Sequence, residues 1–127
     1  MSAAEAQKLS TEYQQIQIDL QKVIETRAKL EAQFSENDSV EKEFNLLTPN
    51  NTIYKMIGGA LVKQEPIEAK ANVRKRIEFI QGEINRIEDQ LKEMQLKSEE
   101  KKNRLVQLQI QAREAQQSQT GAEAIVA

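Results

Sequence analysis

The side chains that most often carry out catalysis or bind metals are scarce in this chain of 127 residues. Histidine is absent, which removes the usual general base and the commonest transition-metal ligand. Cysteine is also absent, which excludes disulfides and thiol chemistry. Neighbouring carboxylates could serve as an acid and a base, and they occur at Glu41/Glu43, Glu88/Asp89 and Glu99/Glu100. Lysines lie close to them on expected helices, so solvated charged faces explain these carboxylates better than catalysis does.

Two other segments could suggest a bound ligand. Residues 58–63 are rich in glycine but lack the spacing and the Lys-Ser/Thr ending of a phosphate-binding loop. Residues 74–76 form a basic run, yet three glutamates lie nearby and the net charge of the chain is −2, which disfavours nucleic acid as a partner. A role for the run as a docking charge stays open. We therefore expect no enzymatic activity, no cofactor and no metal site.

Composition points to long helices rather than to a compact globular core. Charged residues make up 30% of the chain, aromatic residues 4%, and tryptophan is absent. Such a mixture is typical of coiled coils. No apolar run approaches the roughly 18 residues of a membrane-spanning helix, and the N-terminal residues lack the charged-then-apolar order of a signal peptide. We expect a cytoplasmic protein with no membrane partner.

Residues 4–47 carry the alternating four-and-three spacing of a coiled-coil seam. Seven of the first eight seam positions are apolar or aromatic: Leu9, Tyr13, Ile16, Leu20, Val23, Arg27, Leu30 and Phe34. Asn37 and Glu41 then interrupt the seam, and the apolar face drifts to Val40, Phe44 and Leu47. A break near residues 35–39 is an alternative, but the absence of Gly and Pro favours a continuous or gently kinked helix.

Residues 66–115 carry a second seam, starting after Pro66, which suits the first turn of a helix. Eleven of its thirteen positions are apolar: Val73, Ile77, Ile80, Ile84, Ile87, Leu91, Met94, Leu105, Leu108, Ala112 and Ala115, with Ser98 and Lys101 as the polar exceptions. Polar seam residues weaken a coiled coil but restrict its register. Residues 116–127 lose the seam, which predicts a flexible tail.

Residues 52–64 predict a β-hairpin between the helices. Two short runs rich in β-branched and aliphatic residues flank Gly58-Gly59, a pair suited to a two-residue turn. With that turn, Ile57 faces Ala60 and Met56 faces Leu61. The two helices must then run antiparallel. A lone two-stranded hairpin is marginal in water and exposes open edges, so we expect the chain to be a subunit whose assembly depends on Ile53, Tyr54, Met56, Ile57, Leu61 and Val62.

The order helix, hairpin, helix resembles the β-class subunits of prefoldin, a chaperone. The resemblance covers nearly the whole chain before about Gln116 and is carried by residues 30–33 (Leu-Glu-Ala-Gln), the helix end at 43–47, the hairpin segment 61–65 (Leu-Val-Lys-Gln-Glu) and residues 75–77 (Lys-Arg-Ile). It implies a single prefoldin-like domain over residues 1–127, mainly α, in which a long antiparallel two-helix coiled coil bears a hairpin that joins an intersubunit β-barrel.

Further expectations follow from the same resemblance. Two α-class and four β-class subunits would form a hetero-hexamer. The coiled-coil tips would hold unfolded or nascent proteins, such as actin and tubulin, without ATP and would deliver them to the cytosolic group II chaperonin. In this chain the tip residues are expected to be Leu9, Tyr13, Leu105, Val106, Leu108 and Ile110. The alternative is a structural coiled-coil adaptor without chaperone activity. That role does not explain why both faces of the hairpin carry apolar residues.

Overall fold

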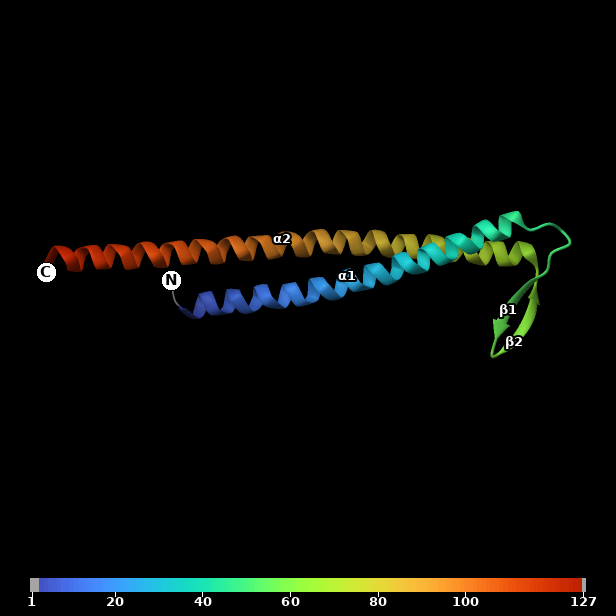
Figure 1. Cartoon of the computed structure of the whole chain (residues 1–127), viewed down its shortest axis with the longest axis horizontal. Coiled ribbons are helices and arrows are strands. Elements are labelled where there is room, and N and C mark those ends of the chain that lie inside the picture. Colours follow the sequence, from blue (N-terminus) through green and yellow to red (C-terminus); the bar gives the residue numbers. More distant parts are fainter. Residues whose placement is uncertain (1–2, 127) are drawn as a thin grey trace. The chain divides into compact units, whose positions relative to one another are not determined.

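The structure is a computed structural model that describes residues 3–126, and of residues 120–126 it describes only the backbone. Its elements follow in the order α1 (Ala3–Leu46), β1 (Ile53–Ile57), β2 (Ala60–Gln64) and α2 (Pro66–Val126) (Figure 1). The chain divides into two compact units. We call Ile24–Asp89, which contains both strands, the hairpin unit, and the remaining described residues, which pair the start of α1 with the later part of α2, the terminal unit.

Both helices are continuous. α1 has 44 residues and runs through Asn37, so the alternative of a break near residues 35–39 is wrong. α2 has 61 residues and continues beyond residue 115, where loss of the seam predicts a tail. Gln and Ala are the commonest residues of this stretch, and both are good helix formers that need no seam to keep their backbone hydrogen bonds. The last residue of the expected tail, Ala127, lies outside the described residues.

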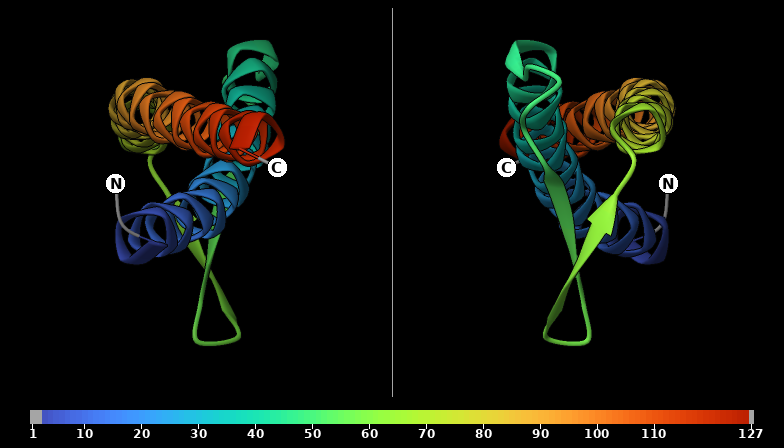
Figure 2. Two further views of the ribbon diagram at one scale, coloured as in Figure 1. Left: turned by 90° about the vertical axis from the view of Figure 1, so that its left-hand side faces the viewer. Right: turned by 90° about the vertical axis from the view of Figure 1, so that its right-hand side faces the viewer.

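The hairpin has the predicted register. Ile57 pairs with Ala60, Met56 with Leu61 and Lys55 with Val62. Gly58 and Gly59 have φ angles of 55° and 84°, and two consecutive positive φ angles define the type I′ turn that joins tightly twisted strands. The strands form a two-stranded antiparallel sheet, which Figure 2 shows as a twisted ribbon.

The seam of α2 supplies most of the buried residues. Its members Val73, Ile77, Ile80, Ile84, Ile87, Leu91, Ser98 and Leu108 are buried. The eight predicted seam residues of α1 from Leu9 to Phe34 are half-buried, as are Val40 and Phe44, and no residue of α1 is fully buried. Leu47, which was expected to continue the apolar face, lies beyond the end of α1 and is exposed. Ala112 and Ala115 are exposed, so their expected place in the seam is wrong. Ala112 lies beside Ala3, where α1 begins, and beyond that point α1 offers no described residue for α2 to pack against.

The connections around the hairpin are closed by local hydrogen bonds. The backbone N–H of Thr48 donates to the Asn51 side-chain oxygen at 2.8 Å, and the N–H of Asn51 donates to the Thr48 carbonyl at 3.0 Å. At the start of α2 the N–H of Ala69 donates to the Glu65 carbonyl at 3.0 Å. Pro66 needs no such partner because it has no N–H, so proline begins the helix without leaving a donor unsatisfied.

Candidate interaction surfaces

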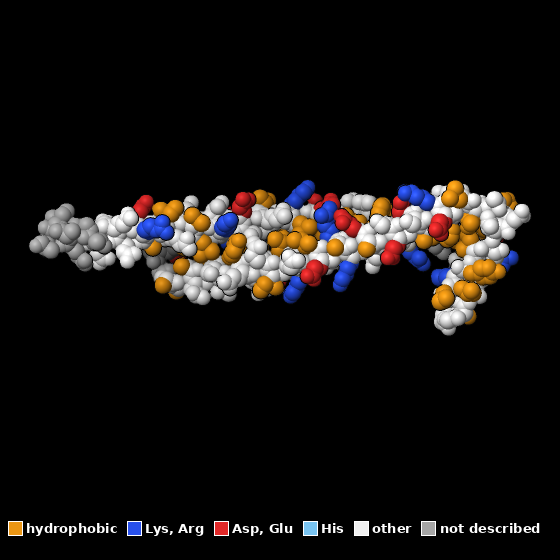
Figure 3. Space-filling model, viewed as in Figure 1, with side chains coloured by type: hydrophobic (Ala, Val, Ile, Leu, Met, Phe, Trp, Pro, Cys, Tyr) orange, Lys and Arg blue, Asp and Glu red, His pale blue; other side chains and the backbone are white. Residues whose placement is uncertain are grey.

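The hairpin carries a concentration of exposed hydrophobic side chains. Five of the six residues predicted to support assembly are exposed: Tyr54 (58%), Met56 (69%), Ile57 (54%), Leu61 (65%) and Val62 (44%). Figure 3 shows hydrophobic side chains along the visible face of the ribbon. Isolated surface hydrophobics are normal in soluble proteins. Five on two five-residue strands form a patch of the kind that marks a protein interface.

Both faces of the hairpin contribute to this patch. In an antiparallel pair, residues directly opposite each other share a face. The register therefore places Tyr54, Met56 and Leu61 on one face, and Ile57 and Val62 on the other. Because hydrogen-bonded and non-hydrogen-bonded pairs alternate along such a pair, alternate amides of β1 and β2 point outward to the two open edges. The hairpin thus offers both faces and both edges to partners.

Ile53, the sixth predicted assembly residue, is different because only 7% of it is exposed. It lies with Phe44 of α1 and Val73 of α2 around a hollow at the base of the hairpin. This side chain therefore packs the hairpin against the helices of its own unit. The sequence does not separate Ile53 from the other five residues, because both faces of the ribbon are apolar and no local pattern distinguishes the strand residue nearest the helices.

The hollow at the base of the hairpin has a volume of about 150 Å³. Besides apolar residues, its walls contain Tyr54, Lys55, Gln64, Asn72 and Arg76. Two cations and no acidic residue line it. Arg76 belongs to the basic run at residues 74–76, for which a docking charge was one expected role.

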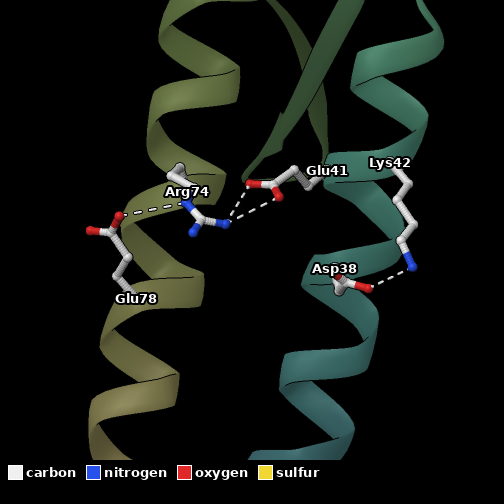
Figure 4. Close-up of polar contacts among 5 residues, drawn as sticks. All are labelled: Asp38, Glu41, Lys42, Arg74 and Glu78. Carbon is white, nitrogen blue, oxygen red and sulfur yellow. Dashed lines mark hydrogen bonds and ion pairs between the residues drawn. The ribbon is translucent and has the colours of Figure 1, made fainter.

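Polar seam residues of the hairpin unit reach across to the opposite helix. Arg27 of α1 pairs with Glu88 of α2 at 2.9 Å and also with Glu31 at 3.3 Å. Arg74 of α2 pairs with Glu41 of α1 at 3.2 Å and contacts Glu78 at 3.5 Å (Figure 4). The two heptads between Arg27 and Glu41 match the two heptads between Arg74 and Glu88, so both pairs fit a single antiparallel register.

The terminal unit has two comparable cross-helix contacts. The Lys101 ammonium donates to a Glu12 carboxylate oxygen at 2.5 Å, and the Gln17 amide donates to the buried Ser98 hydroxyl at 2.5 Å. The hydrogen bond from Lys101 lowers the pKa of Glu12 below its ordinary value, against a smaller opposing effect of desolvation. The polar seam positions were foreseen from the sequence. Their partners were not, because those partners lie on solvent-facing positions that carry no seam signal.

The predicted tip residues fall into two groups. Val106 (44%) and Ile110 (49%) are exposed on α2. Leu108 is buried, and Leu9, Tyr13 and Leu105 are half-buried. These four side chains therefore already pack, in whole or in part, within the terminal unit. The structure adds a hollow of about 380 Å³ in which the small side chains of Ala3, Ala6 and Ser10 lie opposite Leu105 and Leu108. The spacing of these small residues, about one helical turn apart on α1, is the sequence feature from which this hollow could be predicted.

Several exposed hydrophobic residues were not predicted as functional. Leu46, Ile67, Phe79 and Leu96 have exposed fractions of 82%, 85%, 69% and 62%. None of the four occupies a seam position, and the seam is the pattern from which apolar contacts are predicted. Among the side chains that the structure describes, those of residues 3–119, no three acidic groups gather in a way that could hold a metal ion. In the same part of the chain, no helix is apolar over a long enough stretch to cross a membrane.

The comparisons with known proteins agree with this architecture. The model of a family described as prefoldin subunit matches residues 7–119. The chain belongs to the prefoldin subunit family. Prefoldin subunit 6 of Homo sapiens is 46% identical over 110 residues, which cover 87% of this chain and 85% of the human protein. Prefoldin subunit 6 of Saccharomyces cerevisiae is 40% identical over 101 residues, covering 80% and 89%.

A solved structure has the same fold. The prefoldin beta subunit of Thermococcus strain KS-1 has a TM-score of 0.75 and 24% identity to this prefoldin subunit, covering 80% of this chain and 89% of that one. The resemblance to prefoldin and the fold of two long helices around one hairpin are therefore confirmed. Membership in this family indicates a chaperone subunit rather than an enzyme, and implies assembly with other prefoldin subunits.

Proposed function

We propose that this chain is a β-class subunit of a hetero-hexamer of two α-class and four β-class prefoldin subunits, and that its hairpin joins a β-barrel shared among them. The observation that carries the proposal is the exposure of five apolar side chains on a two-stranded sheet with open edges. Neighbouring strands would cover both faces and satisfy the outward amides. Ile53 would contribute indirectly, because its buried side chain holds the hairpin against the helices of its own unit.

We further propose that the terminal unit holds unfolded or nascent clients, actin and tubulin among them, and passes them to the cytosolic group II chaperonin. The protein would work in the cytoplasm, without ATP and without catalysis. Val106 and Ile110 offer apolar surface directly, and the hollow beside Leu105 and Leu108 offers more. Burial stabilises contacts by roughly 25 cal/mol per Å², so one subunit binds weakly and capture depends on several subunits acting together.

The assembly role is tested by Val62→Asp. An unpaired carboxylate buried in a barrel would cost several kcal/mol, on the order of the penalty for an uncompensated buried charge. Native mass spectrometry of the variant mixed with its partner subunits should show the hexamer lost and the variant left as a free, helical chain. Leu96→Asp is the matched control, because it places the same charge at an exposed apolar position on α2. A hexamer of normal mass and yield with Val62→Asp would refute the role of the hairpin.

The client role is tested by removing the terminal surfaces. Deleting residues 1–10 and the chain after Arg104 should leave the hexamer intact and abolish the suppression of client aggregation. The double variant Val106→Ser with Ile110→Ser should weaken suppression in part, since it removes the exposed apolar side chains and keeps the helix. Equal suppression by the truncated and the full-length assemblies would refute the proposal. An adaptor without chaperone activity would form assemblies that never suppress aggregation.

A further inference from the structure

We infer that the hollow at the base of the hairpin, lined by Lys55 and Arg76, receives a carboxylate side chain from the neighbouring prefoldin subunit. The inference rests on the proposed assembly through the hairpin and adds to it a specific polar contact. It concerns an interaction surface of the hairpin unit alone, and its partner is defined by chemistry: an aspartate or glutamate on the adjoining subunit.

The place of the hollow connects it to the proposed interface. Tyr54 belongs both to the exposed apolar patch and to the wall of the hollow. Lys55 follows Tyr54 in β1, and Arg76 lies in the first turns of α2. Lys55 lies on the face of the hairpin that carries Ile57 and Val62, so a subunit whose strand covers that face also reaches this hollow.

The charge of the hollow calls for an anion. Lys55 and Arg76 share its wall, and no acidic residue lines it. Neither cation forms an ion pair within the described part of the chain, whereas the nearby Arg74 contacts both Glu41 and Glu78. Two like charges that share a small concavity repel each other, and an incoming carboxylate would relieve that repulsion. The guanidinium group of arginine also matches a carboxylate in a bidentate geometry.

The size of the hollow decides what kind of anion fits. Sites for small-molecule ligands usually enclose roughly 300–1,000 Å³, and this hollow holds about 150 Å³. It is large enough for the end of an acidic side chain. The apolar walls formed by Phe44 and Ile53 would exclude water around that group, which strengthens the pairing once neighbouring strands cover the hairpin. Charged contacts of this kind set which partner docks and in which orientation.

Zero-length cross-linking tests the contact directly in the assembled hexamer. A carbodiimide activates a carboxylate, and an amine in contact then forms an amide while the carbodiimide becomes a urea. Mass spectrometry of the digested complex should join Lys55 to an aspartate or glutamate of another subunit. Lys70 and Lys75 are exposed lysines of α2 outside the hollow, and they serve as internal controls. Joining of Lys55 only to residues of its own chain, or to none, would overturn the inference.

A pair of matched variants tests the energetic role. Lys55→Gln with Arg76→Gln should raise the subunit concentration needed for half-maximal assembly about fivefold or more at low salt. The difference should shrink near 1 M salt, where the Debye length falls to about 3 Å. Lys70→Gln with Lys75→Gln changes the net charge equally and should have a smaller effect.

The outcomes separate this inference from the assembly role itself. If both double variants assemble alike while Val62→Asp does not assemble, the carboxylate contact is refuted and the role of the hairpin stands. If Val62→Asp assembles normally, the role of the hairpin is refuted. A loss of assembly with Lys55→Gln and Arg76→Gln that does not depend on salt would also contradict an ionic contact.

Discussion

Arg27 occupies a seam position of α1. Its guanidinium group pairs with the carboxylates of Glu31 and Glu88 instead of packing in an apolar core. Its side chain is 39% exposed and that of Glu88 is 43% exposed, so the pair is partly solvated and contributes at most about 1 kcal/mol. Its Nε atom is buried without a partner among the described residues, which lowers the net gain further. The pair matters more for register, because a seam shifted by one heptad would separate Arg27 from Glu88.

Glu12 should make the stability of the terminal unit depend on pH. The hydrogen bond from Lys101 lowers the pKa of folded Glu12 below 4.5. A depressed folded pKa adds stability that is fully present above the unfolded pKa and is lost as the pH falls through the folded pKa. The thermal midpoint of Glu12→Gln should therefore approach that of the unmodified chain only below about pH 4.5. Circular dichroism from pH 7 to pH 3 measures this difference.

A matched variant controls for general acid effects. Glu93 is exposed, and it forms no ion pair within the part of the chain that the structure describes, so Glu93→Gln removes a carboxylate without removing a contact. Its thermal midpoint should follow that of the unmodified chain across the whole range. A gap between Glu12→Gln and the unmodified chain that widened on acidification would contradict the role assigned to Lys101.

Among the elements, α2 contains one position where its own stability can be raised. Gly82 lies inside the helix, and a Cβ added there meets nothing within 4 Å. Gly82→Ala should raise the free energy of unfolding by about 0.5–1 kcal/mol, because alanine restricts the unfolded chain and favours the helix. Urea denaturation of the isolated chain measures this change.

Gly59→Ala is the contrasting variant. Its Cβ would also meet open space, but φ is +84°, a conformation that costs an L-residue about 1–2 kcal/mol. We expect this variant to weaken the hairpin and to leave the helices unchanged, as read from amide protection in β1 and β2. A stabilised hairpin would show that the turn does not keep its positive φ angles.

The elements were predictable to different degrees. Heptad patterns predicted the two helices and the buried face of α2, and the two runs of β-branched and aliphatic residues around Gly58-Gly59 predicted the strand register. The end of α2 was less predictable, because a helix without a seam leaves no pattern apart from good helix formers. Burial of Ile53 and the partners of Arg27 and Lys101 required the three-dimensional packing, since each contact joins residues far apart in the sequence.

At the scale of the whole molecule, the chain combines helices that satisfy their own backbone with a hairpin that does not. Each helix forms its backbone hydrogen bonds internally, and the seam of α2 is largely buried while that of α1 is half-buried. The hairpin keeps only the bonds between β1 and β2, and two strands alone are marginally stable in water. This difference accounts for the proposed assembly, because other subunits can supply what the hairpin lacks.

Hydrogen exchange over residues 53–64 tests this account most directly, measured in the isolated chain and again in the assembly with its partner prefoldin subunits. The account predicts fast exchange of the amides of β1 and β2 in the isolated chain, and strong protection of the same amides, including those at both edges, in the assembly. Strands that are already fully protected in the isolated chain, or edges that remain unprotected in the assembly, would contradict it.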